Sequence, residues 1–68
     1  MRYTVNYEGA FFTDDSDGFN QVGYNSLADA IDLFHMLFYG GFSTAYIKDE
    51  EYQVYYSWCE QLRDFVWD

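Results

Sequence analysis

The sequence predicts a small α+β domain, in which a three- to four-stranded antiparallel sheet carries a central helix and a C-terminal helix on one face. Apolar and polar residues alternate at the start of the chain, a helical pattern fills its middle, and two strand-like runs precede a second helical pattern. Paired strands combined with helices on one face are typical of two-layer α+β domains. The expected order is strand, weak strand, helix, strand, strand, helix, within a single domain over residues 1–68.

The first predicted strand covers residues 2–8, because large side chains occupy every second position: Tyr3, Val5 and Tyr7. Residues 10–13 could extend this strand past a bulge at Gly9, since an isolated glycine in a strand often marks one. The acidic run at residues 14–18 is a turn by composition. Residues 19–24 form a weaker strand, which that turn would pair with the first as a hairpin.

The longest predicted element is a helix within residues 26–41. Ser26 is a suitable N-cap with Asp29 at the capping-box position, and the double glycine at the end supplies a C-cap. Apolar residues recur at helical spacing and define the expected core face: Leu27, Ala30, Ile31, Phe34, Leu37 and Phe38. Leu33 and Met36 lie off this stripe, which makes the second half of the helix apolar nearly all round and a candidate contact surface.

Two further strands are expected over residues 43–48 and 52–56. They enclose a hairpin tip of three acidic residues, which we expect to be well solvated: Asp49, Glu50 and Glu51. Ser57 and Glu60 then have the spacing of a second capping box, which predicts a terminal helix that runs to about Trp67.

The few residues that could bind a metal ion or take part in catalysis are better explained by structural roles. The acidic loop at residues 14–18 lacks carboxylates at both end positions of a calcium-binding loop and is better explained as a solvated turn. His35 follows Asp32 by three residues, and an edge histidine bonded to that carboxylate is favoured over a general base. Cys59, the only cysteine, excludes an internal disulfide and is expected as a small buried filler. We therefore expect no enzyme, metal or cofactor.

The charge balance excludes further classes. Twelve acidic residues face three basic ones, for a net charge of −9. Direct binding to nucleic acid needs a basic patch, which three cations cannot form, and the same argument excludes anionic membranes. No apolar stretch reaches the ~20 residues of a transmembrane helix, and the first residues lack the pattern of a signal peptide. A lone cysteine without a signal favours a cytoplasmic location.

The acidic residues form clusters that are candidates for binding a protein. They are Asp14, Asp15, Asp17, Asp29, Asp32, Asp49, Glu50, Glu51, Glu60, Asp64 and Asp68. The last three recur every four residues, which would make a stripe along the terminal helix. Closely spaced carboxylates can imitate the field of a DNA duplex, with one charge per ~1.7 Å, and attract a cationic groove. Solubility is the other explanation of the acidity, and both stay open.

Exposed tyrosine is favoured at protein-binding hot spots. Eight tyrosines exceed what a small core can bury with every hydroxyl bonded. Three of them are expected partly outside: Tyr39, Tyr46 and Tyr55.

A short, acidic, aromatic-rich chain without catalytic residues resembles phage-encoded anti-defence inhibitors, above all anti-CRISPR proteins. The resemblance covers the whole chain and rests on its size, charge and acidic clusters (DDSD, DEE and the Glu60-Asp64-Asp68 repeat). It implies a stoichiometric inhibitor that binds a CRISPR effector complex in the host cytoplasm and blocks target DNA binding. The alternative is an assembly module that homodimerises, or binds another partner, through the apolar back of the central helix at Leu33 and Met36. Monomer and homodimer both stay open.

Overall fold

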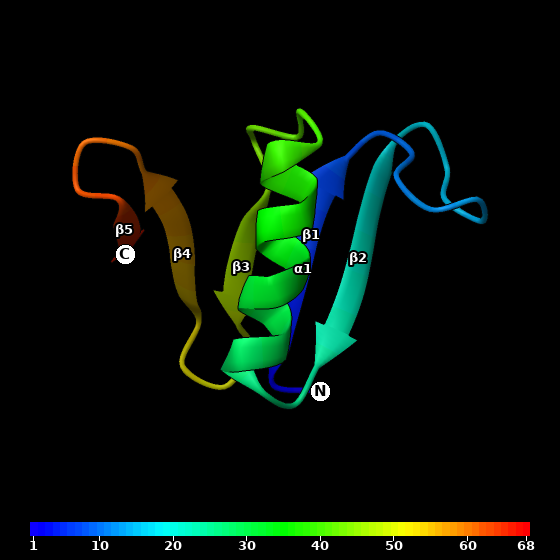
Figure 1. Ribbon diagram of the computed structural model, residues 1–68. Helices are drawn as coiled ribbons and strands as arrows, with labels where there is room; N and C mark the ends of the chain where they lie inside the picture. Colours follow the sequence, from blue (N-terminus) through cyan, green and yellow to red (C-terminus); the bar gives the residue numbers. More distant parts are fainter.

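In the computed structural model, which describes residues 1–68, one helix packs on a five-stranded antiparallel sheet (Figure 1). The elements are β1 (Tyr3–Glu8), β2 (Phe19–Tyr24), α1 (Leu27–Tyr39), β3 (Tyr46–Asp49), β4 (Val54–Cys59) and β5 (Asp64–Trp67). The strands lie in the order β2-β1-β3-β4-β5, and all neighbours are antiparallel. The α+β class is confirmed, but the sheet has five strands and carries one helix.

The prediction of a C-terminal helix is wrong. β4 continues through Ser57 to Cys59, and β5 returns beside it with Trp58 opposite Phe65. Ser57 and Glu60 therefore form no capping box. The residues of both strands are mainly aromatic or β-branched and suit a pleated surface. The left-handed backbone of Arg63, with φ of 52°, lies in the turn that joins them.

The β1–β2 hairpin is confirmed, with Val5 opposite Val22 in its middle. The expected extension of the strand over residues 10–13 is not formed. Gly9 has a φ of +102°, where a side chain would be strained, and its N–H donates to the Gly18 carbonyl at 2.9 Å. The chain therefore leaves the sheet at Gly9, and the loop at residues 9–18 projects beyond the ends of β1 and β2 (Figure 1).

β1 is buried on both faces. Tyr3, Val5 and Tyr7 belong to the core, as their alternation predicts. Thr4 and Asn6 alternate with these residues and face away from α1, yet they are only 8% and 7% exposed. Side chains from neighbouring segments form hydrogen bonds with the polar groups on this face. Gln21 Nε2 donates to Asn6 Oδ1 at 2.9 Å, and Thr4 Oγ1 donates to Glu50 at 3.0 Å.

α1 has the predicted position, with Ser26 at its N-cap and a left-handed Gly41 after its end. The Ser26 side chain makes no capping hydrogen bond. The buried face differs from the predicted stripe, because Leu33 is buried while Leu27, Ile31 and Phe38 are only half-buried: its members are Ala30, Leu33, Phe34 and Leu37. The physical reason is the missing second helix. α1 packs on β1, β2 and β3, so its other flank is left beside β4 and β5.

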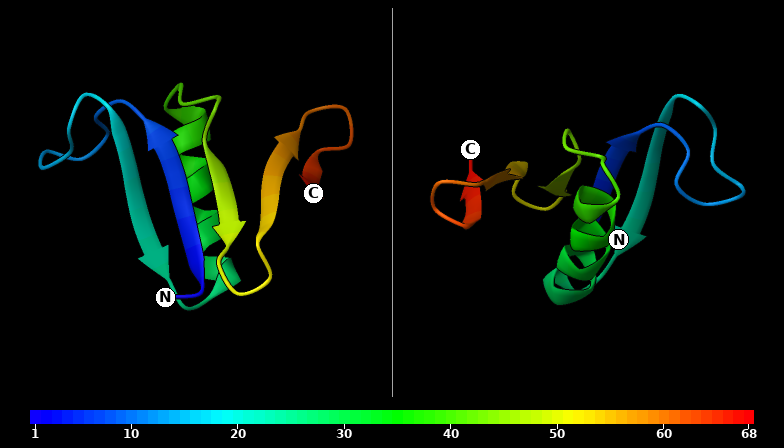
Figure 2. Two further views of the ribbon diagram at one scale, coloured as in Figure 1. Left: turned by 180° about the vertical axis from the view of Figure 1, so that it is seen from behind. Right: turned by 45° about the horizontal axis from the view of Figure 1, so that its top comes forward.

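The sheet therefore has a covered half and an open half. α1 covers β2, β1 and β3, whereas β4 and β5 extend to one side of it (Figure 2). Aromatic side chains join the two halves, since the ring centroid of Phe34 lies 5.0 Å from Phe65 and 6.3 Å from Trp58. α1, with 13 residues, is the one helix present, and it lacks the length that crossing a membrane requires.

Candidate protein-binding surface

The expected acidic hairpin tip is paired with two of the three cations in the chain. The Arg2 guanidinium lies 3.1 Å from the Asp49 carboxylate and 3.2 Å from Glu51, and Lys48 Nζ lies 3.2 Å from Glu50. Asp49 is only 2% exposed, and the hydrogen bond from Arg2 lowers its pKa. The prediction of a solvated tip is thus wrong for Asp49, whereas Glu50 is half-exposed and Glu51 is exposed. The charges of this cluster are largely compensated within the protein.

Asp15 also has a structural role. Its carboxylate accepts hydrogen bonds from the Tyr7 hydroxyl at 2.6 Å and from the backbone N–H groups of Phe11 and Phe12 at 3.0 and 2.8 Å. The bond from Tyr7 lowers the pKa of Asp15. Burial, helped by this carboxylate, raises the pKa of Tyr7 to about 12. Asp15 therefore holds the loop against β1 and is not free to bind a partner or a metal ion.

Six of the predicted acidic site residues remain exposed and form no hydrogen bond or ion pair through their side chains: Asp14, Asp17, Asp29, Asp32, Glu60 and Asp68. Asp29 and Asp32 line a groove of about 350 Å³ between α1 and the β2 side of the sheet. Its apolar lining is Phe12, Tyr24, Leu33 and Met36. We call this the α1–β2 groove. Phe12 reaches it from the loop that also carries Asp14 and Asp17, so the structure brings these two acidic clusters toward one side of the molecule.

The third expected cluster does not form a stripe. Glu60 lies in the turn after β4, Asp64 begins β5, and Asp68 follows it. Asp64 accepts a hydrogen bond from the N–H of Phe65 at 2.7 Å. The expected spacing along one helix face is wrong because the segment is a hairpin, in which the three residues lie at a turn and at the two ends of a strand.

The three tyrosines that were predicted to be partly exposed lie in two separate places. Tyr39 is 79% exposed at the end of α1. Tyr46 and Tyr55 lie on the sheet face away from α1, with ring centroids 5.8 Å apart, and Tyr55 is 43% exposed. They do not make one aromatic site together.

His35 and Cys59 differ from their predicted surroundings. The expected bond between His35 and Asp32 is not formed. The imidazole packs beside Tyr39 and Trp58 instead, and its buried Nδ1 has no hydrogen-bond partner. Cys59 lies at the end of β4, half-buried, and its thiol donates to Gln61 Oε1 at 3.4 Å. Neither residue joins the α1–β2 groove.

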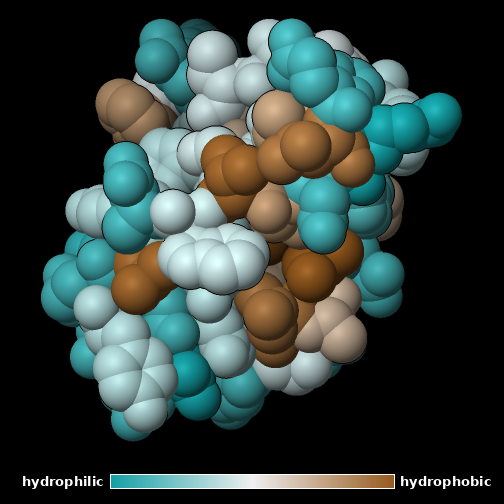
Figure 3. Space-filling model, turned by 90° about the vertical axis from the view of Figure 1, so that its left-hand side faces the viewer, coloured by the Kyte–Doolittle hydropathy of each residue, from teal (hydrophilic) through white to brown (hydrophobic).

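Sequence reasoning missed the open surface of the β4–β5 hairpin, because that segment was assigned to a helix. Three side chains there are exposed: Leu62, Val66 and Trp67. Figure 3 shows hydrophobic side chains gathered on this side of the molecule within a hydrophilic surround. The run Phe65-Val66-Trp67 carried the available signal, since aromatic and β-branched residues together favour a strand.

The α1–β2 groove is suited to binding a cationic side chain. A Lys or Arg side chain could lay its aliphatic stem on the apolar lining and place its charged group beside Asp29 or Asp32. No protein-family model, curated protein or solved structure matches the chain. The proposal below therefore depends on the geometry and charge of the molecule.

Proposed function

We propose that the chain is a stoichiometric protein inhibitor that binds a cationic, nucleic-acid-binding surface of a host defence complex. A CRISPR effector is the proposed partner, and the inhibitor would prevent target DNA from binding there in the cytoplasm. It would carry out no reaction and need no cofactor. The observation that supports this proposal is the set of four unpaired, exposed carboxylates on the side of the α1–β2 groove: Asp14, Asp17, Asp29 and Asp32.

The distribution of ion pairs supports this proposal. Asp49, Glu50 and Glu51 are the acids paired with Arg2 or Lys48, so nine of the twelve acids (12 − 3) have no cationic partner within the chain. Unpaired like charges on a small domain repel one another, and a cationic partner surface would relieve that repulsion. Because two of the three cations are already paired, a nucleic acid would find no basic patch to bind.

The spacing of the groove carboxylates also suits a mimic of DNA. Asp29 and Asp32 are three residues apart on α1, which places their Cβ atoms about 5–6 Å apart. They project from a rigid helix, so their geometry is fixed before a partner binds. A pre-ordered row of charges binds with less loss of entropy than a flexible acidic tail.

An assembly module that pairs through Leu33 and Met36 of α1 is not favoured. Leu33 is 4% exposed and belongs to the core, which leaves Met36, at 56% exposed, as the accessible residue of that pair. One methionine offers little apolar area to a second copy of the chain. Sedimentation at high concentration would test whether the chain dimerises by any surface.

The test of the proposed function is competition with DNA. A panel of purified, guide-loaded CRISPR effector complexes is titrated with a labelled target duplex, with and without the protein. We expect at least one effector to lose DNA binding at about one equivalent of protein, and the inhibition to weaken as salt rises from 50 to 300 mM. Unchanged DNA affinity across the panel would contradict the proposal.

The choice of variants follows from the structure. Charge reversal of the whole loop cluster or of the hairpin tip would remove Asp15 or Asp49, and would test folding as well as binding. Neutralising Asp29 and Asp32 together changes no hydrogen bond of the fold. Asp29→Asn/Asp32→Asn is therefore the variant that isolates the surface.

A further inference from the structure

β5 is an edge strand whose outer backbone groups face no neighbouring strand. The N–H and C=O groups of Asp68 bond to Tyr55 of the neighbouring segment. Since the antiparallel pattern alternates, those of Val66 and Asp64 also point toward β4. The backbone groups of Phe65 and Trp67 therefore point away from the sheet. The Phe65 N–H donates to the Asp64 carboxylate at 2.7 Å, whereas the Phe65 carbonyl and both backbone groups of Trp67 form a template for a further strand.

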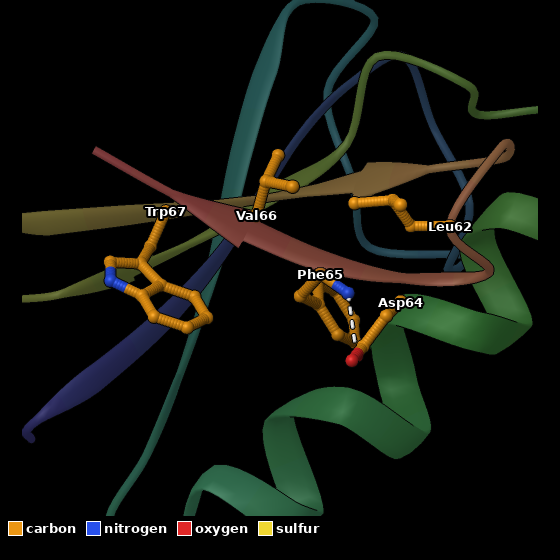
Figure 4. Close-up of a pocket in the computed structure, with 5 residues that line it drawn as sticks. All are labelled: Leu62, Asp64, Phe65, Val66 and Trp67. Atoms are coloured by element: carbon orange, nitrogen blue, oxygen red, sulfur yellow. Dashed lines mark hydrogen bonds between the residues drawn. The ribbon is translucent and has the colours of Figure 1, made fainter.

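Hollows lie along β5 on both faces. On the α1 side, Phe65 and Trp67 border a groove of about 180 Å³ that reaches Leu27 and Ile31. A hollow of about 340 Å³ lies on the other face beside Val66 and Asp68, and one of about 520 Å³ follows the edge itself. Figure 4 shows Phe65 and Trp67 on the side of β5 that faces the helix and Val66 on the opposite side. A strand added here would find room for its side chains on both faces.

The opposite edge of the sheet is less open. β2 has outward backbone groups at Phe19, Gln21 and Gly23, by the same alternation from the Gly9–Gly18 bond. Met1 lies over Gly23, close enough that its sulfur would be 2.9 Å from an added Cβ. The Gln21 side chain is bonded to the neighbouring strand. The two edges therefore differ, and β5 is the one with free space on both faces.

The charges beside β5 define the chemistry of its partner. Asp64 and Asp68 flank the apolar residues of the strand, about 13 Å apart along an extended chain. Glu60 lies in the preceding turn, and none of these three carboxylates forms an ion pair. A second copy of β5 paired so that Phe65 meets Trp67 would place Asp64 opposite Asp68, which is repulsive. A strand with basic ends is favoured instead.

We propose that β5 binds an extended segment of a partner protein as a sixth strand, and that this segment has an apolar centre flanked by Lys or Arg four residues apart. Main-chain hydrogen bonds to the Phe65 carbonyl and to the N–H and carbonyl of Trp67 would hold it, as in other cases of strand addition. Its apolar side chains would lie against Phe65 and Trp67, and its basic ends would meet Asp64 and Asp68. This inference concerns the opposite side of the sheet from the α1–β2 groove and does not depend on the proposed function.

The test uses the whole chain and a labelled peptide, acetyl-Lys-Val-Leu-Val-Lys-amide, in a fluorescence anisotropy titration at 50 mM salt. We expect saturable binding that a peptide with Glu in place of both Lys lacks. Deuterium exchange should slow at the amide of Trp67 when the peptide binds, and change little at Val66, which already bonds to β4. Absence of binding up to 1 mM peptide, or equal binding of both peptides, would overturn the proposal.

Two matched pairs of variants locate the site. Trp67→Pro removes an outward N–H that β4 does not use, whereas Trp67→Ala removes the side chain alone, so the proline variant should bind about ten-fold more weakly than the alanine variant. Asp68→Lys should weaken binding at least three-fold, while Glu8→Lys, two strands away from β4, should stay within two-fold of the wild type. Equal affinities within either pair, or a dimer of the free protein that Trp67→Pro dissociates, would overturn the proposal.

Discussion

The two halves of the sheet are built differently. Every buried residue of the protein comes from β1, α1, β3 or Ala45 just before β3, and β4 and β5 supply none. The open half nevertheless carries several large side chains that touch the covered half, with Phe34 as their common neighbour. The covered half therefore contains the core that stabilises the fold. The open half packs against that core through a few side chains and leaves apolar surface exposed for contacts.

We expect the largest loss of stability from a substitution at Phe34, where the covered and open halves of the sheet meet. Phe34 is 1% exposed and contacts both the core and the β4–β5 hairpin, so Phe34→Ala should cost about 3–5 kcal/mol in the free energy of unfolding. A core of this size rarely supplies more than roughly that amount, so the variant should be largely unfolded. Urea denaturation followed by circular dichroism measures this. A stable Phe34→Ala variant would show that the two halves fold without their shared ring.

The second largest effect concerns the ion pair between Arg2 and the buried carboxylate of Asp49. Asp49→Asn should lower the urea midpoint at pH 7, because Arg2 loses its buried partner. The pKa of Asp49 is lower in the folded than in the unfolded state, so its contribution is present above the unfolded pKa of about 3.9 and is lost as the pH falls through the folded value. The two proteins should therefore converge in stability at the lowest pH. A midpoint difference that persists unchanged below pH 2 would argue against a charge effect.

A third effect, at high pH, tests the hydroxyl that anchors the loop. Burial raises the pKa of Tyr7 to about 12, above the ordinary value of 10.0, so its contribution is complete below pH 10 and is lost as the pH rises toward 12. Absorbance at 295 nm should show one tyrosine that ionises late. Tyr7→Phe should remove this late step and loosen the loop. If the step is retained in Tyr7→Phe, it belongs to another residue.

The smallest effect should be found in the open half. Trp67 is 68% exposed, and Trp67→Ala should change the free energy of unfolding by no more than about 0.5 kcal/mol. The same urea titration used for Phe34→Ala gives the comparison. If both substitutions cost the same, the distinction between a covered and an open half would fail in energetic terms.

The sequence allowed prediction of the elements whose pattern is local. α1, the β1–β2 hairpin and the strands β3 and β4 could be located from caps, alternation and glycine stops. The terminal segment could not, because Trp58, Phe65 and Val66 fit both a helical stripe and a strand. The choice between helix and strand depends on the pairing of β5 with β4, and on the contacts of Trp58 and Phe65 with Phe34, which is distant in the sequence.

The same limit applies to the candidate site. Composition identified the acidic residues, and exposure could be inferred for those on α1. It could not show that Asp49 pairs with Arg2, which is 47 residues away, or that Asp15 bonds to Tyr7. These partners, which no local sequence pattern identifies, separate structural carboxylates from free ones. The usable acidic surface is therefore smaller than the sequence alone suggested.

The most direct measurement is the concentration of protein that halves target-DNA binding by a purified CRISPR effector that the wild-type chain inhibits. The comparison is between Asp29→Asn/Asp32→Asn and the control Glu8→Gln/Glu60→Gln, which removes the same charge from exposed positions outside the groove. We predict that the groove variant needs at least ten times more protein, while the control stays within two-fold of the wild type. Equal loss in both variants would show that net charge, and not the α1–β2 groove, accounts for inhibition.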